Sequence, residues 1–321
     1  MSLVAILLAL GLEQWRAFDW RAGVERAFVR YARFLERKLN GGTRQHGVIA
    51  AIAAVAPPVV AVAAVYWLAD ALHPLAGLVV NVIVLYCLMG FRRFSHALSA
   101  IVAALSANDL PAARRALSAW RTGASTMDLA SGDVARLAIE RGLVDAYRQV
   151  FAVLFWFVIL PGPAGAVLYR AAALLADEWR GPVPGVEPSP LVQSRSEFGL
   201  PARALLIALD WLPVRLTALS FAVVGDFEDA VACWRTQASR WTAQEGGMTI
   251  GVLLAAGGGA LGVQLGGMLP TLSGDPDVRP ELGLGDPVEP DVLPSAVGLV
   301  WRALVLWLLV ILLVTIANLV P

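Results

Sequence analysis

The sequence predicts an all-α, polytopic membrane protein with about 5–7 membrane-embedded helices and a helical cytoplasmic domain. The first observation is composition: 58% of the residues are hydrophobic, only 16% are charged, and mean hydropathy is +0.67. Soluble globular domains carry about 25% charged residues. The second is a pattern in which long apolar segments alternate with arginine-rich ones. The third is a formal net charge of zero, which gives no global basic field and leads us to expect no nucleic-acid partner.

The first segment, residues 1–46, combines an apolar start with a basic helix. Residues 1–12 are apolar but shorter than the roughly 20 residues of a straight span, and they lack the basic flank and the cleavage site of a secretory signal. Residues 16–38 are arginine-rich, and Val24, Phe28 and Tyr31 begin an apolar stripe at helical spacing that continues to Leu35 and Leu39. This pattern predicts an amphipathic helix on an anionic lipid surface, or one that packs on its own protein.

Residues 47–91 predict a transmembrane hairpin. Residues 47–70 are long enough to cross a bilayer, and residues 75–91 return after a tight turn at His73-Pro74. Pro57-Pro58 within the first span predicts a kink.

Residues 92–149 carry many arginines, so the positive-inside rule predicts a helical cytoplasmic domain. Asn108 or Asp109 is expected to cap its second helix, with Pro111 in the first turn. A third helix is expected to begin near Ser131 or Asp133.

Residues 150–247 predict a membrane-embedded core with broken helices. Residues 150–175 are apolar but interrupted at Pro161-Gly162-Pro163, which indicates one kinked span or two half-helices. We expect residues 181–199 to form a loop, 202–224 a span, and 225–247 a polar connector.

Residues 248–321 predict two C-terminal spans. The first, 248–270, is rich in glycine and suited to close helix packing, and the second is 296–320. The loop between them, 271–293, is acidic and nearly free of lysine and arginine. Its lack of basic residues predicts an external location.

Two ionisable residues stand in the apolar stretch "ALDWLPVRLTAL", Asp210 and Arg215. Charges in such segments face a polar interior or a functional site. Pro213 deprives the carbonyl of Leu209 of its amide partner, which favours a polar pocket beside Asp210. Asp210 and Arg215 differ by about 140° around a helix, so each needs another partner. Arg170, with Asp177 and Glu178, offers a structural ion-pair lattice; the functional alternative is an anion site around Arg215.

Familiar catalytic motifs are missing from the sequence. It contains no phosphate-binding loop of the GxxxxGK[ST] type, no HExxH and no GxSxG. His46, His73 and His96 are far apart in sequence, and the two cysteines have no metal-ligand spacing, so we expect no metal site. His96 is a binding candidate because it follows Arg92-Arg93 by one helical turn.

Three stretches carry a family resemblance. They are "NDLPAARRALSAW", "VARLAIERGLVDAYRQVFAVLFWFVILPGPAGAVLYRAAALL" and "ALDWLPVRLTALSFAVVGDFEDAVACW". In order and spacing they resemble the CobD/CbiB superfamily of bacterial inner-membrane proteins. The resemblance implies a multi-pass inner-membrane protein. The superfamily includes adenosylcobinamide-phosphate synthase, which uses ATP to join an aminopropanol moiety to adenosylcobyric acid, and AmpE, which is associated with control of β-lactamase induction.

The resemblance also bears on the branch. The synthases carry a Glu-Asn-Thr-Ser-Asp-Gly run where this chain has residues 144–149, and only Glu140 keeps an earlier family glutamate. Tyr147-Arg148 and "LDWLPVRL" look more like AmpE. We therefore expect an AmpE-like regulatory protein without a cofactor.

Two alternatives stay open. One is the synthase itself, with magnesium-ATP and a corrinoid at a remodelled cytoplasmic pocket. The other is a transporter or lipid-handling protein, suggested by charges beside broken helices. The residues proposed for such a pocket are the catalytic candidates Glu140, Asp145 and Asp210 and the binding candidates Arg148, Arg170, Arg215 and His96.

Overall fold

The computed structural model describes residues 2–15, 21–120, 128–180, 190–243, 246–269 and 277–317. These residues form two compact units, each built from two stretches of the chain. Unit 1 contains residues 1–89 and 152–211, and unit 2 contains residues 90–151 and 212–321. The five consecutive segments expected from the sequence stay a prediction about domain organisation.

Unit 1 is entirely helical in its described part. Its helices are α1 (Ser2–Trp15), α2 (Arg21–Leu39), α3 (Arg44–Leu72), α4 (Pro74–Leu88), α8 (Ala152–Ile159), α9 (Ala164–Glu178) and the first part of α10 (Pro190–Val224). The segment 181–199 was expected to be a loop. That prediction is wrong for 190–199, which are helical, and residues 181–189 lie outside the described residues.

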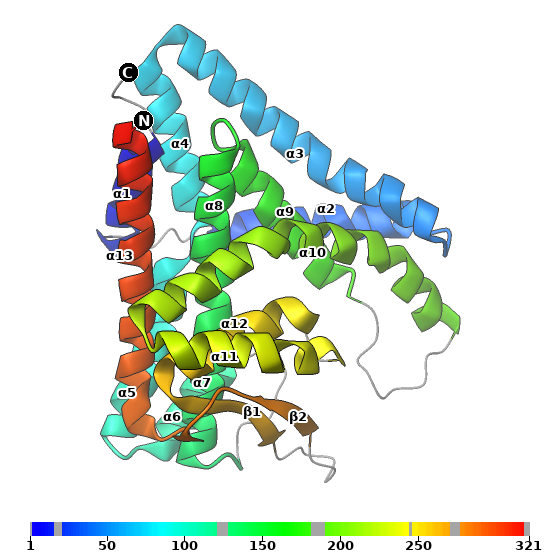
Figure 1. The fold of residues 1–321 in the computed structure, drawn as a ribbon. Coiled ribbons are helices and arrows are strands. Elements are labelled where there is room, and N and C mark those ends of the chain that lie inside the picture. Colours follow the sequence, from blue (N-terminus) through cyan, green and yellow to red (C-terminus); the bar gives the residue numbers. More distant parts are fainter. Residues whose placement is uncertain are drawn as a thin grey trace. The chain divides into compact units, whose positions relative to one another are not determined.

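The predicted hairpin is present as α3 and α4, which run in opposite directions from their shared turn (Figure 1). His73 ends α3 and caps α4, because its Nδ1 accepts a hydrogen bond from the backbone amide of Leu75 at 3.1 Å. Pro74 occupies the first turn of α4, where its missing N–H costs nothing.

The core of unit 1 lies where α2 and α9 pack on the first half of α3. The apolar stripe of α2, including Tyr31 and Leu35, packs into this core, and the Tyr31 hydroxyl donates to the carbonyl of Ala53 at 2.8 Å. Small residues on α3 allow the close approach; a Cβ on Gly47 would lie 2.3 Å from the carbonyl oxygen of Phe198. The stripe of this amphipathic helix therefore faces its own protein.

The break at Pro161-Gly162-Pro163 separates two short helices, α8 and α9, which pack on one another. Gly162 has φ +70°, a left-handed conformation that glycine adopts without steric cost. Of the two alternatives for residues 150–175, the structure has the two half-helices.

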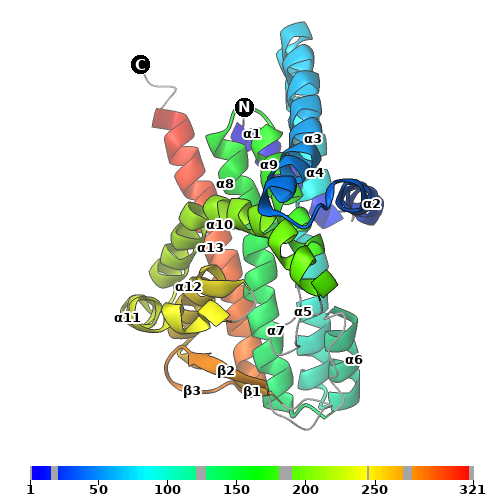
Figure 2. The same ribbon diagram turned by 90° about the vertical axis from the view of Figure 1, so that its right-hand side faces the viewer.

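Unit 2 begins with three helices, α5 (Phe91–Ser106), α6 (Leu110–Trp120) and α7 (Ser131–Ala146), which lie side by side (Figure 2). Asp109 caps α6 as predicted, since its Oδ1 accepts from the amide of Ala112 at 2.9 Å. α7 begins at Ser131, also as predicted. It continues into a π-helix, η1 (Tyr147–Phe151).

The C-terminal part of unit 2 differs from expectation. The predicted connector 225–247 is largely helical, with α11 (Phe227–Gln237) and the 3-10 helix η2 (Ala238–Ala243). The predicted span 248–270 is instead a short buried helix, α12 (Gly247–Leu261), followed by strand β1 (Val263–Leu269). A buried helix inside a protein and a membrane span share an apolar composition, so the sequence did not separate them.

The predicted loop 271–293 also has structure where it is described. Strands β2 (Asp277–Leu282) and β3 (Asp286–Pro287) lie on either side of β1, in the order β2-β1-β3. β1 pairs with β2 in the antiparallel direction and with β3 in the parallel direction. The 3-10 helix η3 (Pro290–Val292) leads into the last helix, α13 (Leu293–Ala317). This small sheet is the one departure from all-α among the described residues.

Four helical stretches are long and apolar enough to cross a membrane: Arg44–Leu72, Ser131–Ile159, Glu197–Val224 and Pro290–Ala317. Four shorter apolar helices, among them α1 and α4, accompany them. The second half of α13 exposes a series of large apolar side chains such as Leu309, Leu313 and Ile316, as expected of a surface that meets lipid. The prediction of a polytopic α-helical membrane protein is confirmed.

Candidate functional site

The candidate functional site in unit 2 lies on α7 and the π-helix that follows it. π-turns widen a helix locally and occur often at functional sites. Here the π-turn spans Tyr147–Phe151, and the side chains of Tyr147 and Phe151 are fully buried. The candidate polar residues lie just before it and inside it.

Asp145 is a buried carboxylate, only 5% exposed, that is held through a single oxygen. Its Oδ2 accepts from the indole Nε1 of Trp120 at 2.9 Å and from Nε of Arg141 at 3.2 Å. Both of these donors bind Oδ2, so among the described residues Oδ1 remains available for a further donor. The carboxylate is thus oriented by α6 and by the preceding turn of α7.

Gln149 follows Asp145 by four residues, a spacing that puts both side chains on one face of a helix. Its Oε1 is buried and has no hydrogen-bond partner among the described residues. A buried acceptor left without a donor costs about 1–3 kcal/mol. Two acceptors on adjacent turns, one of them a carboxylate, suit a ligand that carries several N–H donors.

Glu140 lies one turn before this pair and is fully engaged. Its Oε2 accepts from Nη1 of Arg279 at 2.6 Å, and its Oε1 accepts from Nη2 of Arg279 at 3.2 Å and from the amide of Gly266 at 2.8 Å. The guanidinium of Arg279 also lies over the ring of Trp241, 5.7 Å from its centroid. Glu140 therefore fixes the β1–β2 hairpin to α7 in the described structure.

Arg136 makes a second connection between α7 and β1. Its Nη2 donates to Asp133 at 2.7 Å and to the carbonyl of Met268 at 2.9 Å. Gly267 has φ +74°, and a Cβ there would lie 2.9 Å from Nη1 of Arg136, so the position is suited to glycine.

These contacts correct the predicted sidedness. The sequence placed residues 92–149 in the cytoplasm and 271–293 outside. In the structure Arg279 binds Glu140, and the carbonyl of Val288 lies 2.8 Å from the position of a Cβ on Gly132. Segments in direct contact cannot lie on opposite faces of a bilayer. The scarcity of basic residues was misleading because the segment packs on α7 through its one arginine, Arg279.

Asp210 lies in unit 1 and is 3% exposed. Its Oδ1 accepts a hydrogen bond from the hydroxyl of Tyr169, which is fully buried, at 2.9 Å. The free carbonyl expected at Leu209 is also found in a polar setting, since it accepts from the indole Nε1 of Trp156 at 3.1 Å. Two polar contacts therefore lie at and beside Asp210, and a pocket there stays a prediction.

The predicted ion-pair lattice has different partners. Arg170 pairs with Glu25 on α2, and Glu178 pairs with Arg33 on the same helix at 2.6 Å. Tyr169, the neighbour of Arg170, contacts Asp210 instead. These two ion pairs join α9 to α2 within unit 1.

The remaining binding candidates belong to unit 2. Arg148 is half-buried in the π-helix, and Arg215 is half-buried on α10. His96 is exposed on α5, and its Nε2 accepts from Nε of Arg92 at 3.1 Å. The roles assigned to all these residues stay predictions.

Sequence reasoning missed Trp120, Arg136, Trp241, Gly266 and Arg279 as parts of this arrangement. Trp120 ends the motif "NDLPAARRALSAW", so the sequence did draw attention to its surroundings. No pattern in the local sequence indicated that residues of β1 and β2 would contact α7. Among the described residues, no group of three His, Cys, Asp or Glu side chains could hold a metal ion.

The fold and site define a helical membrane protein in which two buried carboxylates lie on one partly π-helical segment. The CobD/Cbib protein family matches residues 6–300. The chain therefore belongs to the CobD/CbiB family.

Named relatives point to one branch of that family. The chain is 37% identical to the cobalamin biosynthesis protein CobD of Stutzerimonas stutzeri over 291 residues, 89% of each chain. It is 37% identical to the protein of the same name from Chromobacterium violaceum over 234 residues, 73% of this chain and 70% of the relative. A third, from Geobacter metallireducens, is 29% identical over 69% of this chain and 66% of its own. No solved structure matches.

These relatives overturn the expectation of an AmpE-like regulator, which is wrong. That expectation rested mainly on the polar run of the synthases, which residues 144–149 lack. In the structure this segment holds a buried acid at Asp145 and a buried amide oxygen at Gln149, so the absence of the run did not exclude a polar site.

Proposed function

We propose that the chain is an enzyme of cobalamin biosynthesis, an adenosylcobinamide-phosphate synthase that joins an aminopropanol moiety to adenosylcobyric acid using ATP. The observation that carries this proposal is the identity of 37% to a cobalamin biosynthesis protein CobD across 89% of both chains. A coverage this complete includes the α7 site and the hairpin fixed to it.

The α7 site offers what the amine half of such a reaction requires. In ATP-dependent amide formation the carboxylate oxygen takes a phosphoryl group, the amine nitrogen then forms the C–N bond, and phosphate leaves with that oxygen. The amine must give up a proton to a base. We assign the base to Asp145, whose Oδ1 is available while Oδ2 is held by Trp120 and Arg141.

Gln149 completes the amine subsite in this proposal. An ammonium group has three N–H donors, which Oδ1 of Asp145 and the partnerless Oε1 of Gln149 would receive. Arg148 and Arg215 are assigned to the anionic groups of the substrates. ATP would bring its magnesium as part of the co-substrate, and we derive no step through the metal.

The location follows from the substrates. ATP is cytoplasmic, so we propose a bacterial inner-membrane protein whose α5–α7 region and β1–β2 hairpin face the cytoplasm. Both regions belong to unit 2.

Complementation tests the function. The gene is expressed in a strain that lacks the synthase and needs cobalamin to grow, with adenosylcobyric acid supplied. Growth is expected with the unmodified chain and with the exposed control Asp286→Asn, but not with Asp145→Asn. Adenosylcobinamide, which lies after the proposed step, should restore growth to every strain. Failure of the unmodified but membrane-inserted chain to rescue would overturn the proposal.

Kinetics on the purified protein test the roles. Asp145→Asn is expected to lower kcat by about 10²–10⁴-fold, the usual contribution of a general base. Gln149→Leu is expected to raise KM for the amine substrate and to leave KM for ATP unchanged. An equal rise of both KM values would contradict an amine subsite at Gln149.

A further inference from the structure

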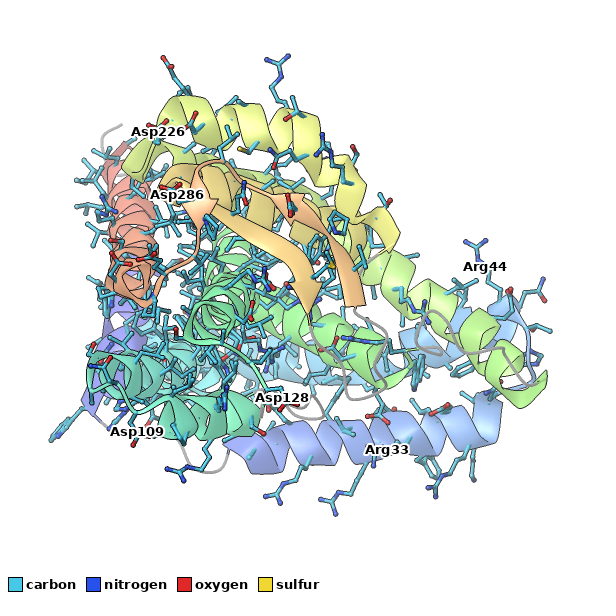
Figure 3. All side chains as sticks on the ribbon, turned by 90° about the horizontal axis from the view of Figure 1, so that it is seen from below. Arg33, Arg44, Asp109, Asp128, Asp226 and Asp286 are labelled. Carbon is cyan, nitrogen blue, oxygen red and sulfur yellow. The ribbon has the colours of Figure 1, made fainter. Side chains whose placement is uncertain are left out.

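The outer face of α2 carries a row of basic side chains. Arg26, Arg30, Arg33, Arg37 and Lys38 are all exposed. Figure 3 labels Arg33 on this helix, where side chains fan outward from the ribbon, and Arg44 near the start of α3. We call the five exposed residues of α2 the basic face.

The helix has two glutamates against the five positive charges of this face, and neither extends freely into solvent: Glu25 pairs with Arg170, and Glu36 is only 7% exposed. Arg33 pairs with an acid on another helix, Glu178. The basic face therefore presents a net positive surface of closely spaced guanidinium and ammonium groups.

The place of α2 in unit 1 indicates what this surface meets. Its apolar stripe is already buried against α3 and α9, so the helix is held firmly and does not need lipid to cover that side. α3, a candidate membrane span, begins at Arg44, only five residues after α2 ends. On the first turns of α3, Ile49 and Ile52 are 60% and 62% exposed, an apolar surface suited to acyl chains.

An aromatic side chain borders the basic face. Phe34 is about half exposed, and the ammonium of Lys38 lies 5.0 Å from the centroid of the Phe34 ring. Basic residues mixed with an aromatic ring, at the end of a span, are the composition of helices that lie at a headgroup layer.

We propose that the basic face of α2 is a binding surface for anionic phospholipid headgroups. The side chains would contact headgroup phosphates beside the start of α3, and Phe34 would reach the acyl boundary. The proposal is independent of the enzymatic function, because none of these residues belongs to the α7 site.

The test uses the full chain, purified in an uncharged detergent. Dioleoylphosphatidylglycerol and dioleoylphosphatidylcholine are titrated separately, and bound lipids are counted by native mass spectrometry. The variant Arg26→Gln/Arg30→Gln/Arg37→Gln removes three charges from the basic face. The control Arg115→Gln/Arg235→Gln/Arg240→Gln removes three exposed charges from other helices, α6, α11 and η2. Thermal unfolding establishes that both variants fold.

The unmodified chain and the control are expected to bind the anionic lipid more tightly than the zwitterionic one, and the α2 variant is expected to bind it roughly tenfold or more weakly. Added salt should reduce the preference, because screening weakens exposed charges. Equal binding by the α2 variant and the unmodified chain would overturn the proposal, as would an equal loss in the control. If the α2 variant instead raises KM for a phosphate-bearing substrate in lipid-free detergent while lipid binding is unchanged, the surface serves substrate and the proposal fails.

Discussion

At the scale of single residues, burial decides which ionisable groups are structural. Glu140 and Arg279 each have a side chain only 9% exposed, and they contact one another through two hydrogen bonds. Such a pair is not a strong source of net stability, but removal of one member leaves the other as an uncompensated buried charge. Asp145, by contrast, keeps one oxygen for another partner, which is why we assign chemistry to it and positioning to Glu140.

Breaking the Glu140–Arg279 pair should be costly from either side. Glu140→Gln and Arg279→Met are each expected to lower the free energy of unfolding by about 3–5 kcal/mol. The double variant should lose clearly less than the sum, because no charge is then left without its partner. Unfolding in detergent measures this, with exposed Arg302→Gln as the control. Strictly additive losses would mean that the two side chains do not interact.

Cys233 provides a residue-scale test of pH dependence. Burial, and secondarily the negative charge of Asp229, raise the pKa of its thiol above the ordinary 9.0. The folded state therefore favours the neutral thiol. The contribution of this thiol to the free energy of unfolding is fully present below pH 9, the pKa in the unfolded chain, and is lost as the pH rises through the pKa in the folded state. In a Cys87→Ser background we expect alkylation by iodoacetamide at pH 8 to be roughly tenfold or more slower than in the unfolded chain. Equal rates would show that the thiol is accessible and unshifted.

At the scale of elements, proline and glycine determine where helices break and what must satisfy the freed backbone groups. Pro213 cannot donate to the carbonyl of Leu209, and Trp156 on α8 donates to it instead. Gly162 reverses the chain between α8 and α9, and Gly267 lets Arg136 reach β1. At Leu209 a side chain from another helix thus replaces the missing helix hydrogen bond.

The pairing of Trp156 with Leu209 can be tested by a double-mutant cycle. Trp156→Phe removes the indole donor and is expected to cost about 1–3 kcal/mol for the buried carbonyl left unpaired. The cost should shrink in a Pro213→Ala background, where the new amide at position 213 supplies the missing helix hydrogen bond. Thermal unfolding of the four proteins gives the coupling. The same cost in both backgrounds would mean that Trp156 acts by packing alone.

At the scale of the whole molecule, long-range pairing overrides local composition. The acidic segment beyond β1 has no basic flanks to hold it inside by charge, yet Arg279 brings it to α7, 139 positions earlier in the chain. A direct contact of this kind is stronger grounds for sidedness than residue counts in a loop.

The corrected topology predicts that positions 118 and 286 are reached from the same side of the membrane. Ser118 on α6 and Asp286 on β3 are exposed. Single cysteines at these positions, in a chain whose Cys87 and Cys233 are replaced by alanine, should react with an impermeant maleimide in inside-out vesicles and not in intact spheroplasts. Labelling of the two positions from opposite faces would contradict the topology.

Part of the site was visible from the sequence and part was not. Glu140 and Asp145 stood out through the family resemblance. Asp210 stood out because acids are rare in apolar segments, and Leu209 because Pro213 follows it by four residues. The partners Trp120, Tyr169 and Arg279 did not stand out as partners, because they come from other elements and nothing in the local sequence says which distant acid each one contacts. The branch of the family was misjudged for a related reason. The synthases' polar run is missing from residues 144–149, and we took its absence to mean that the synthase activity was absent too.

The sequence by itself determined the long apolar helices within 47–70, 202–224 and 296–320, the amphipathic α2, the cap at Asp109 and the break at Gly162. These follow from hydrophobic periodicity, side-chain capping and the backbone limits of proline and glycine, all of which act within a few residues. Only the tertiary structure decided that residues 248–269 are a buried helix and a strand, and that α2 turns its apolar stripe to its own protein. It also decided which basic side chain pairs with which acidic one. Those outcomes depend on which distant part of the chain covers an apolar or charged group, and the local sequence does not specify that contact.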